Sequence, residues 1–267
     1  MEIVFLKNKA KEIRKQILKM AYESNSAHIS SSLCVVDILT VLYWDIMKIN
    51  PKHPNDKNRD RFILSKGHAA AALYAVLADK HYFDSKLLQT YNKNGTLLGD
   101  HPIYGIPGVE LATGSLGHGL PVACGMALNE KLLNTKKRIF VLISDAECQE
   151  GSVWEAILFA GQHKLKNLVL LIDYNKLQAL GKTKDIIDLE PFKEKFQVFG
   201  WNTQIIDGNS VQELKKTLAS RSISKPTAII CRTIGGKGVE FMENDWQWHY
   251  KNLDKNLYEL AVKLIDK

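Results

Sequence analysis

Two apolar runs with a helical segment between them dominate the pattern of hydrophobic and polar positions. Residues 139–143 and 168–172 carry no polar side chain, and residues 153–163 lie between them with helical spacing. Continuous apolar runs of this length are typical of parallel strands that are buried on both faces. The stretch from Val141 to Asn175 therefore predicts a β-α-β unit, and ligands of such sheets bind beyond the carboxyl ends of the strands.

The rest of the chain continues this alternation of strands and helices. Apolar runs predict further strands at residues 61–65, 203–206 and 227–231. Helical spacing predicts helices over residues 1–24, 33–47, 68–80, 120–133, 191–199, 211–219 and 254–265. No internal repeat or linker divides the chain. The pattern predicts an α/β fold, a single doubly wound, mostly parallel sheet with helices on both faces, in one domain over residues 1–267.

Composition narrows the class of protein. Hydrophobic residues make up 45% and charged residues 24% of the chain, which is usual for a soluble globular protein. No apolar run approaches the roughly 18 residues that span a bilayer, and the N-terminus lacks the apolar core of a signal peptide. The cysteines at positions 34, 124, 148 and 231 form no Cys-x-x-Cys pair. We therefore expect reduced thiols and a cytoplasmic location, with no membrane contact.

The net charge of +7 raises the question of a nucleic-acid partner. The basic residues are scattered, and no basic stripe is interleaved with aromatic side chains. Small anionic ligands are the better explanation of the charge, and no nucleic acid is expected as a partner.

Metal-type oxygen ligands follow both central strands. Asp145 comes after the first strand and Asn175 ends the second. A carboxylate, an amide oxygen and a backbone carbonyl at adjacent strand ends would supply half of a Mg²⁺ or Ca²⁺ shell, and a diphosphate the remainder. The N–H groups of the helix that starts near Ser152 would favour the phosphates. The alternative is that Asp145 and Asn175 only cap turns, as both residue types often do.

Four histidines stand at the ends of predicted elements. His28, His68, His101 and His249 each lie beside small residues or in a loop. If the fold brings them to one cleft, they would suit a polyhydroxylated or anionic substrate and proton transfer near neutral pH. The alternative is four separate surface or hydrogen-bonding histidines.

Two acids, Glu147 and Glu150, lie in the turn after the first central strand. Acids near a helix N-terminus are mildly favourable as solvated residues. A buried Glu150 would instead have a shifted pKa and relay protons.

Several short blocks occur in an order that carries a family resemblance. They are Ala27-His28, residues 64–69 (Leu-Ser-Lys-Gly-His-Ala), 99–102 (Gly-Asp-His-Pro), 107–110, 113–117 (Thr-Gly-Ser-Leu-Gly), 145–152 with 154–156, 173–175 (Asp-Tyr-Asn), 237–239 with 242–244, and Trp248-His249. Together the blocks resemble the thiamine-diphosphate-binding domain of transketolases, specifically the N-terminal subunit of split, two-component transketolases. The resemblance covers essentially the whole chain and implies the PP-type thiamine-diphosphate fold.

The resemblance implies a set of site residues. Mg²⁺ (or Ca²⁺) would be held by the side chains of Asp145 and Asn175 and the carbonyl of Leu177. Thiamine diphosphate would contact Lys66, His68, Gly114, Ser115, Leu116, Asp145, Ala146, Glu147, Asn175, Ala179, Lys237 and His249. The catalytic set would be His28, His68, His101, Glu150 and His249, with Glu150 in a subunit interface and in the acid network between paired active sites.

The resemblance also implies a reaction and a partner. The cofactor supplies the carbanion chemistry, and a two-carbon ketol (glycolaldehyde) unit passes from a ketose donor to an aldose acceptor. A full-length transketolase continues past the region matched here into a pyrimidine-binding domain, which carries the glutamate that protonates the aminopyrimidine. A partner subunit with that domain is expected, most simply in an α2β2 heterotetramer.

Departures from the family pattern leave other functions open. Ala146 replaces the second glycine of the usual Gly-Asp-Gly turn, and residues 28–31 read His-Ile-Ser-Ser in place of His-Pro-Gly-Gly. Gly235 replaces a frequent lysine, Ala179 a larger aliphatic residue, and His118 a glutamine. One alternative is therefore a biosynthetic transketolase with an unusual acceptor, such as a modified or nucleotide-linked sugar. Another is a degenerate scaffold subunit.

Overall fold

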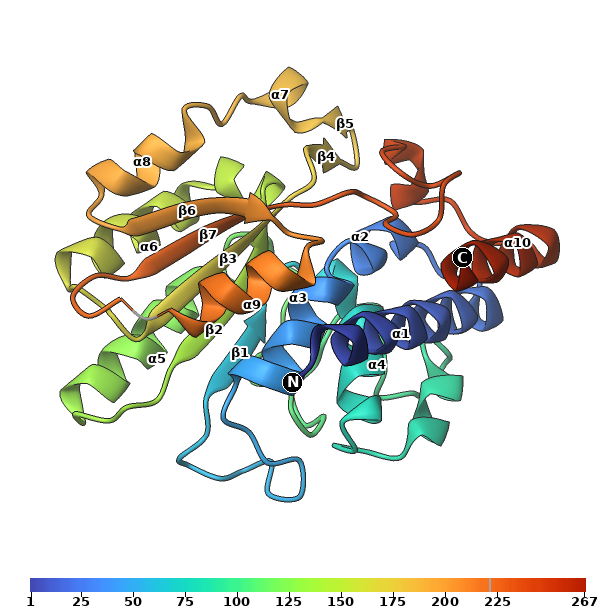
Figure 1. Cartoon of the computed structure of the whole chain (residues 1–267), viewed down its shortest axis with the longest axis horizontal. Helices are drawn as coiled ribbons and strands as arrows, with labels where there is room; N and C mark the ends of the chain where they lie inside the picture. Colours follow the sequence, from blue (N-terminus) through green and yellow to red (C-terminus); the bar gives the residue numbers. More distant parts are fainter. Residues whose placement is uncertain (221) are drawn as a thin grey trace.

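A five-stranded parallel sheet forms the centre of the molecule in the computed structural model, which describes residues 1–220 and 222–267 (Figure 1). The strands are β1 (Arg61–Leu64), β2 (Ile139–Ser144), β3 (Leu168–Tyr174), β6 (Asn202–Asp207) and β7 (Thr227–Arg232). Their order is β1-β2-β3-β7-β6, and every neighbouring pair is parallel. The predicted strands and the predicted mostly parallel sheet are confirmed.

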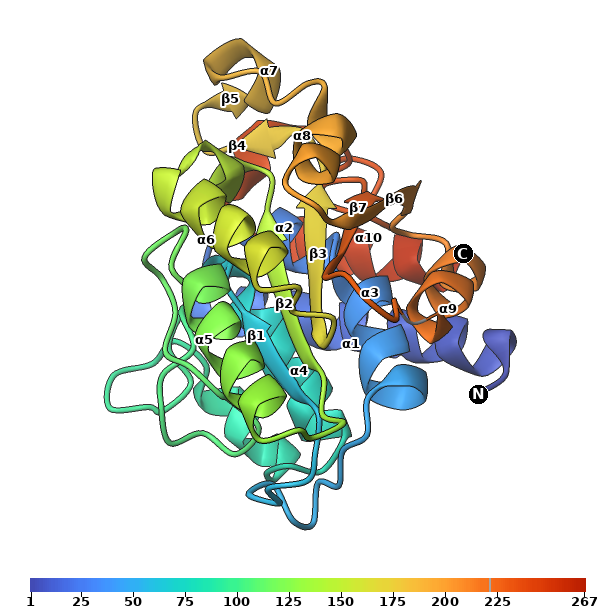
Figure 2. The same cartoon turned by 90° about the vertical axis from the view of Figure 1, so that its left-hand side faces the viewer.

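The helices alternate with these strands as the spacing predicts. They are α1 (Ile3–Ser24), α2 (Ile29–Leu33), α3 (Val36–Val41), α4 (Ala70–Asp79), α5 (Gly119–Leu132), α6 (Gly151–Gln162), α7 (Thr183–Ile186), α8 (Phe192–Val198), α9 (Val211–Ala219) and α10 (Lys255–Asp266). Helices α5 and α6 cover one face of the sheet, while α1, α3, α4 and α9 lie on the other (Figure 2).

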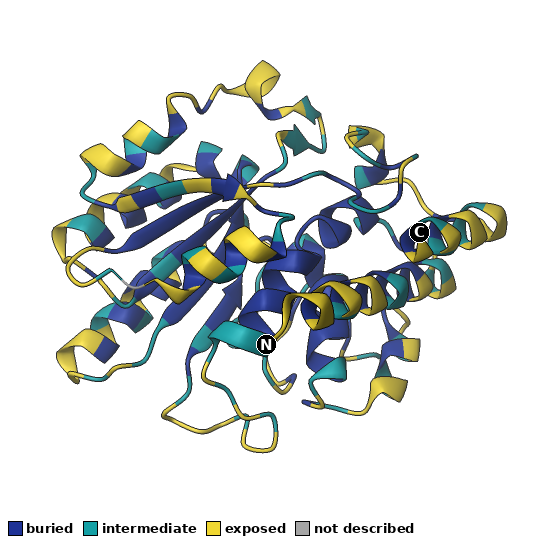
Figure 3. Ribbon diagram, in the orientation of Figure 1, coloured by how far each residue is buried: buried dark blue, intermediate teal, exposed yellow. Residues whose placement is uncertain are grey.

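Side chains of each strand alternate between two separate cores, because successive residues of a strand point to opposite faces. Phe140 and Leu142 of β2 belong to the core under α1, α3 and α4. Ile139, Val141 and Ile143 belong to the core under α5, α6 and α8. Burial on both faces explains why these runs contain no polar alternation, and Figure 3 shows the central strands as mostly buried.

Residues 29–46 differ from the predicted single helix over 33–47. They form α2, then α3, then a π-helical turn over Leu42–Ile46. By length and composition this window could cross a membrane, which corrects the expectation that no such run exists, but 83% of it is buried inside the fold. It occupies the position of a core segment between α1 and the sheet.

A small antiparallel hairpin that the sequence did not predict follows β3. Its strands are β4 (Leu177–Gln178) and β5 (Gly181–Lys182), and α7 comes directly after. The hairpin lies beyond the carboxyl end of β3, so it stands at the edge of the sheet where α/β folds bind ligands (Figure 1).

Candidate functional site

Asp145 lies at the carboxyl end of β2, fully buried. Its carboxylate accepts hydrogen bonds from the N–H groups of Ala146 and Lys176 and from the hydroxyl of Thr183, each at 2.9 Å. The contacts with Lys176 and Thr183 bring the segment after β3 to the end of β2. The parallel register of the two strands therefore places Asp145 beside the loop that carries Asn175.

Burial and a second carboxylate set the protonation of Asp145. Burial, followed by the charge of Asp173, raises the pKa of Asp145 to about 7. Asp173 is also fully buried, at the end of β3. Two buried acids at adjacent strand ends favour a cation between or beside them, because a positive charge would relieve the cost of ionising both.

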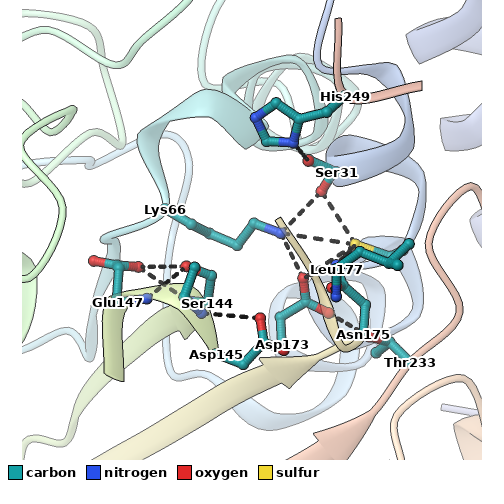
Figure 4. A network of polar contacts seen from close by, with 12 residues as sticks. Ser31, Lys66, Ser144, Asp145, Glu147, Asp173, Asn175, Leu177, Thr233 and His249 are labelled. Atoms are coloured by element: carbon teal, nitrogen blue, oxygen red, sulfur yellow. Dashed lines mark hydrogen bonds and ion pairs between the residues drawn. The ribbon is translucent and has the colours of Figure 1, made fainter. Parts of the chain in front are cut away.

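Lys66 supplies one such charge to Asp173. The Lys66 side chain is 1% exposed, and its ammonium forms an ion pair with the Asp173 carboxylate and donates to the carbonyl of Ser31 at 3.2 Å. Figure 4 shows the Lys66 side chain reaching between Ser31 and Asp173. Burial alone would lower the pKa of Lys66, but the charge of Asp173 raises it above its usual value. Lys66 is thus committed to a structural pair within the site.

Asp173 and Ser31 are residues that the sequence reasoning did not assign to the site. Asp173 accepts from Lys66, from the Thr233 hydroxyl and from the Asn175 amide. The sequence signal for Asp173 is its position directly after the apolar run of residues 168–172, because a charged residue that continues a buried strand requires a partner.

Two of the three predicted metal ligands, Asn175 and Leu177, lie beside a cavity. The N–H of Leu177 donates to the Asn175 amide oxygen at 2.8 Å. Asn175 and Leu177 line a cavity of about 440 Å³ with Thr183 and the lysines at 176, 182 and 184, a volume that suits a small ligand. The nitrogen Nε2 of Gln178 is buried without a partner among the described residues.

These features fit a divalent cation that is shared with a phosphate group. Among the described residues, no three His, Cys, Asp or Glu side chains are grouped as a complete metal site. Mg²⁺ characteristically takes one or two carboxylates and completes its shell with water and phosphate oxygens. Asp145, the Asn175 amide and the Leu177 carbonyl would hold such an ion, and the three cavity lysines complement an anion.

The four predicted histidines converge. The centroid of the His28 ring lies 5.5 Å from that of His68, 6.1 Å from that of His101 and 5.0 Å from that of His249. The centroids of the His68 and His249 rings are 5.3 Å apart. These four residues are far apart in the chain, so it is the fold that brings their rings together. None of them lines the cavity beside Asn175.

Three of these imidazoles are held in their neutral form. Burial lowers the pKa of His249 to about 4 and that of His68 well below its usual value, and it also lowers the pKa of His101. The positive charge of Lys66 acts in the same direction on His68. Neutral imidazoles offer one donor and one acceptor each, a chemistry that matches hydroxyl groups.

Glu147, which the resemblance places in contact with the cofactor, has its carboxylate enclosed by hydrogen bonds from the protein. Its fully buried carboxylate accepts from the Ser65 hydroxyl and from the N–H groups of Gly117, at 3.0 Å, and Ser144, at 2.9 Å. These bonds join the ends of β1 and β2 to the loop after residue 113. Burial raises the pKa of Glu147. The Glu147 side chain therefore braces the loop after residue 113 against the ends of β1 and β2, and both of its carboxylate oxygens accept hydrogen bonds from the protein.

The loop that Glu147 braces carries three predicted cofactor contacts. Gly114 and Ser115 are exposed and Leu116 is half-buried. A Cβ on Gly114 would lie 3.3 Å from the His101 ring, so this loop passes directly over the histidine cluster. Ala179 is half-buried in the hairpin between β4 and β5.

Neither Lys237 nor Glu150 lines the cavity beside Asn175. The Lys237 ammonium is 3.6 Å from the Glu243 carboxylate and lines a separate cavity with Lys7 and Lys11. The Lys237 ammonium thus has Glu243 as its partner in the single chain, and its contact with the cofactor stays a prediction. Glu150 is exposed in the single chain at the start of α6, so its burial in a subunit interface stays a prediction.

Gly235 stands within the site. A Cβ there would lie 2.9 Å from the Leu177 side chain and 3.2 Å from the Ser30 hydroxyl. The missing side chain thus leaves room for the hairpin to close against α2.

Comparison with known proteins gives a family for this geometry. Residues 6–262 match the model of the transketolase thiamine diphosphate binding domain. The chain is 36% identical to an apulose-4-phosphate transketolase subunit of Phocaeicola vulgatus, over 100% of this chain and 96% of that protein. It is 40% identical to 6-deoxy-6-sulfo-D-fructose transketolase subunit SqwG of a Clostridium species, over 98% and 96%.

A solved structure agrees. Transketolase from Campylobacter jejuni superposes with a TM-score of 0.94 at 32% identity, over 100% of this chain and 43% of that one. The sequence-based assignment of family and fold is confirmed. The chain belongs to the transketolase family, as an N-terminal subunit that carries its thiamine diphosphate binding domain.

Proposed function

We propose that this chain is the cofactor-binding half of a two-subunit transketolase that transfers a two-carbon ketol unit from a ketose to an aldose. The observation that carries the proposal is the convergence of four imidazoles, with rings 5.0 to 6.1 Å apart for the pairs with His28, at the edge of the sheet that also holds Asp145. The enzyme would act on sugars or sugar phosphates in the cytoplasm.

The residues divide into two groups by chemistry. Asp145, Asn175 and the Leu177 carbonyl would hold Mg²⁺ or Ca²⁺, and through it the diphosphate. The histidines would bind the hydroxyl groups of the ketose and move protons there, since neutral imidazole both donates and accepts hydrogen bonds. Bound thiamine diphosphate supplies the carbanion chemistry.

The proposal includes a partner subunit with a pyrimidine-binding domain, in an α2β2 assembly. Two relatives carry the word subunit in their names. The exposed faces of α5 and α6 support such a contact, because Val122, Leu158 and Phe159 are 38%, 56% and 38% exposed there. Glu150 stands at the start of the same helix α6. Apolar side chains beside an exposed acid suit a subunit interface.

Reconstitution tests this proposal directly. The chain is purified alone and with the product of the neighbouring gene, and ketol transfer is measured with thiamine diphosphate and Mg²⁺. Transfer is expected only from the pair. Turnover by the single chain would refute the division of labour, and failure of the pair to bind thiamine diphosphate by calorimetry would favour the scaffold function.

A second candidate is the same chemistry on a specialised sugar. The floor formed by Ile29, Ser30 and Ser31 is buried and lies against the histidine cluster, with the Ser31 hydroxyl 3.5 Å from the Nδ1 atom of His249. Relatives named for apulose 4-phosphate and for a sulfonated fructose also favour it. A panel of modified ketose donors and acceptors, tested with the reconstituted pair, decides. Preference for ribose or erythrose phosphates would end this alternative.

A further inference from the structure

One histidine of the cluster differs from the others in its partner. The Nδ1 atom of His28 lies 2.9 Å from a carboxylate oxygen of Asp100. Among the described residues, none of the other three imidazoles contacts a carboxylate; His249 is 3.5 Å from a hydroxyl, that of Ser31. The side chains of His28 and Asp100 are 14% and 28% exposed, so the contact is largely protected from water.

The carboxylate of Asp100 is itself held in place. Tyr91, whose side chain is buried, donates its hydroxyl hydrogen to the other carboxylate oxygen at 3.1 Å. Burial alone would raise the pKa of Asp100, but the hydrogen bond from His28 and its charge lower it below its usual value. Asp100 therefore remains ionised near neutral pH. An ionised carboxylate only accepts hydrogen bonds, so the Nδ1 atom of His28 must be the donor.

The backbone of His28 provides a second observation. His28 adopts φ 59° and ψ 22°, the left-handed region that non-glycine residues rarely occupy. Its N–H donates to the carbonyl of His249 at 3.0 Å. Residues are held in such conformations when the surrounding structure fixes them, often at functional sites. The imidazole is thus fixed from the backbone side and from the ring side.

We infer that Asp100 is a positioning residue that fixes the tautomer and orientation of His28, so that neutral His28 carries hydrogen on Nδ1 and offers Nε2 as a free acceptor for a substrate hydroxyl. In this arrangement Nε2 accepts a proton from a hydroxyl group and returns it to the same or a neighbouring oxygen, with no other reactant required. The substrate class, a ketose, rests on the proposed function; the tautomer does not.

Other ionisable groups surround His28 and shape any pH dependence. His101 lies next to Asp100 in the same loop, and His68 precedes α4. His249 and Tyr250 come from the segment before α10, with the Tyr250 ring 5.7 Å from that of His28. Because burial keeps His68, His101 and His249 neutral, Asp100 is the charged partner that acts on His28 within the cluster.

Imidazole ¹⁵N spectra of the full chain test the tautomer without substrate or partner. His28 is assigned with a His28→Gln variant, and the spectra are recorded at about pH 9, well above the ordinary pKa of an imidazole. We expect a protonated Nδ1 and an unprotonated Nε2 in the unsubstituted chain and in Asp100→Asn, whose amide oxygen still accepts, and a mixture of tautomers in Asp100→Ala. Hydrogen on Nε2 of the unsubstituted chain would overturn the inference.

Kinetics of the reconstituted pair separate positioning from simple loop support. General acid–base catalysis typically contributes about 10²–10⁴-fold to a rate. Loss of the carboxylate that positions His28 is therefore expected to lower kcat at least about tenfold in Asp100→Ala and to shift the pH profile. Tyr91→Phe keeps the contact with His28 and is expected to change kcat less than about threefold. Equal losses in both variants, or an unchanged pH profile in Asp100→Ala, would mean that Asp100 only supports the loop. If neither the unsubstituted pair nor any variant transfers a ketol unit, the proposed function fails, while the spectra still decide the tautomer of His28.

Discussion

Lys66 and Asp173 form an ion pair that is almost completely enclosed, with exposures of 1% and 0% for the two side chains. The pair lies between the ends of β1 and β3. On one side it reaches the Ser31 carbonyl and, through Ser31, the His249 ring; on the other it reaches Asn175. One buried contact therefore connects the predicted metal ligands with the histidine cluster.

Breaking this pair from one side should be more damaging than removing both charges. Lys66→Met leaves the Asp173 carboxylate buried without its cation, which typically costs about 3–5 kcal/mol. The double variant Lys66→Met/Asp173→Asn carries neither charge and is expected to be less destabilised than the sum of the two single variants. Urea unfolding of the unsubstituted chain, of the single variants Lys66→Met and Asp173→Asn, and of the double variant measures this coupling.

An exposed pair provides the matched control for that cycle. Lys251 and Asp245 are 3.7 Å apart, with side chains 47% and 38% exposed. Lys251→Met should change the free energy of unfolding little, since solvent screens such pairs. Additive effects of the Lys66 and Asp173 substitutions would show that the two charges do not interact as the structure indicates.

The histidine cluster should make the protein sensitive to mild acid. The pKa of His249 falls from its ordinary value to about 4 on folding, because burial disfavours the charged ring. The unfolded chain therefore binds more protons between about pH 6.5 and pH 4, and stability is lost as the pH falls through that window. A shift of this size corresponds to at most about 3 kcal/mol.

A histidine substitution checks this origin. His249→Asn removes the titrating group, so its unfolding free energy should fall less steeply between pH 6.5 and 4 than that of the unsubstituted chain. Denaturant unfolding at a series of pH values gives both slopes. Identical slopes would assign the acid sensitivity to other groups.

Cation binding should strengthen as the pH rises through neutrality. The pKa of Asp145 is raised to about 7 by burial and by Asp173, so a proton competes with Mg²⁺ for this carboxylate below that pH. Affinity for Mg²⁺ with thiamine diphosphate is expected to fall by up to about tenfold per pH unit below 7. Calorimetry at pH 6, 7 and 8 measures the dependence.

Two acid-to-amide variants assign that dependence. Asp145→Asn should bind the cation weakly at every pH. Asp188 lines the cavity beside Asn175, so Asp188→Asn controls for the loss of one negative charge near the site and should keep the pH dependence. If Asp145→Asn retains tight binding, Asp145 is not the ligand.

How much of this site the sequence predicts depends on the range of the interactions. Buried strands are encoded locally, so β2 and β3 and the positions of Asp145 and Asn175 at their ends were predicted. The hairpin over residues 177–182 and the division of residues 29–46 depend on packing against distant segments, and local propensity does not specify them.

The partners of charged side chains also depend on distant segments, so the sequence does not specify them. Lys66 was placed near the diphosphate by resemblance, yet its ammonium faces Asp173, 107 positions away in the chain. Lys237 likewise turns toward Glu243. The direction of a long charged side chain is set by which opposite charge lies nearby, and that depends on the assembled fold. For the same reason, the sequence alone is compatible both with a cluster of the four histidines and with four separate positions.

A glycine in α6 should prove indispensable for packing although it weakens the helix. A Cβ on Gly161 would overlap the carbonyl oxygen of Phe199, which follows α8. Alanine normally stabilises a helix by up to about 1 kcal/mol relative to glycine, whereas overpacking costs about 1–3 kcal/mol. Gly161→Ala is therefore expected to destabilise the protein. In α5, a Cβ on Gly125 meets no heavy atom within 4 Å, so Gly125→Ala should stabilise. Thermal unfolding of the two variants should shift in opposite directions, and a shared direction would contradict the close approach of α6 to Phe199.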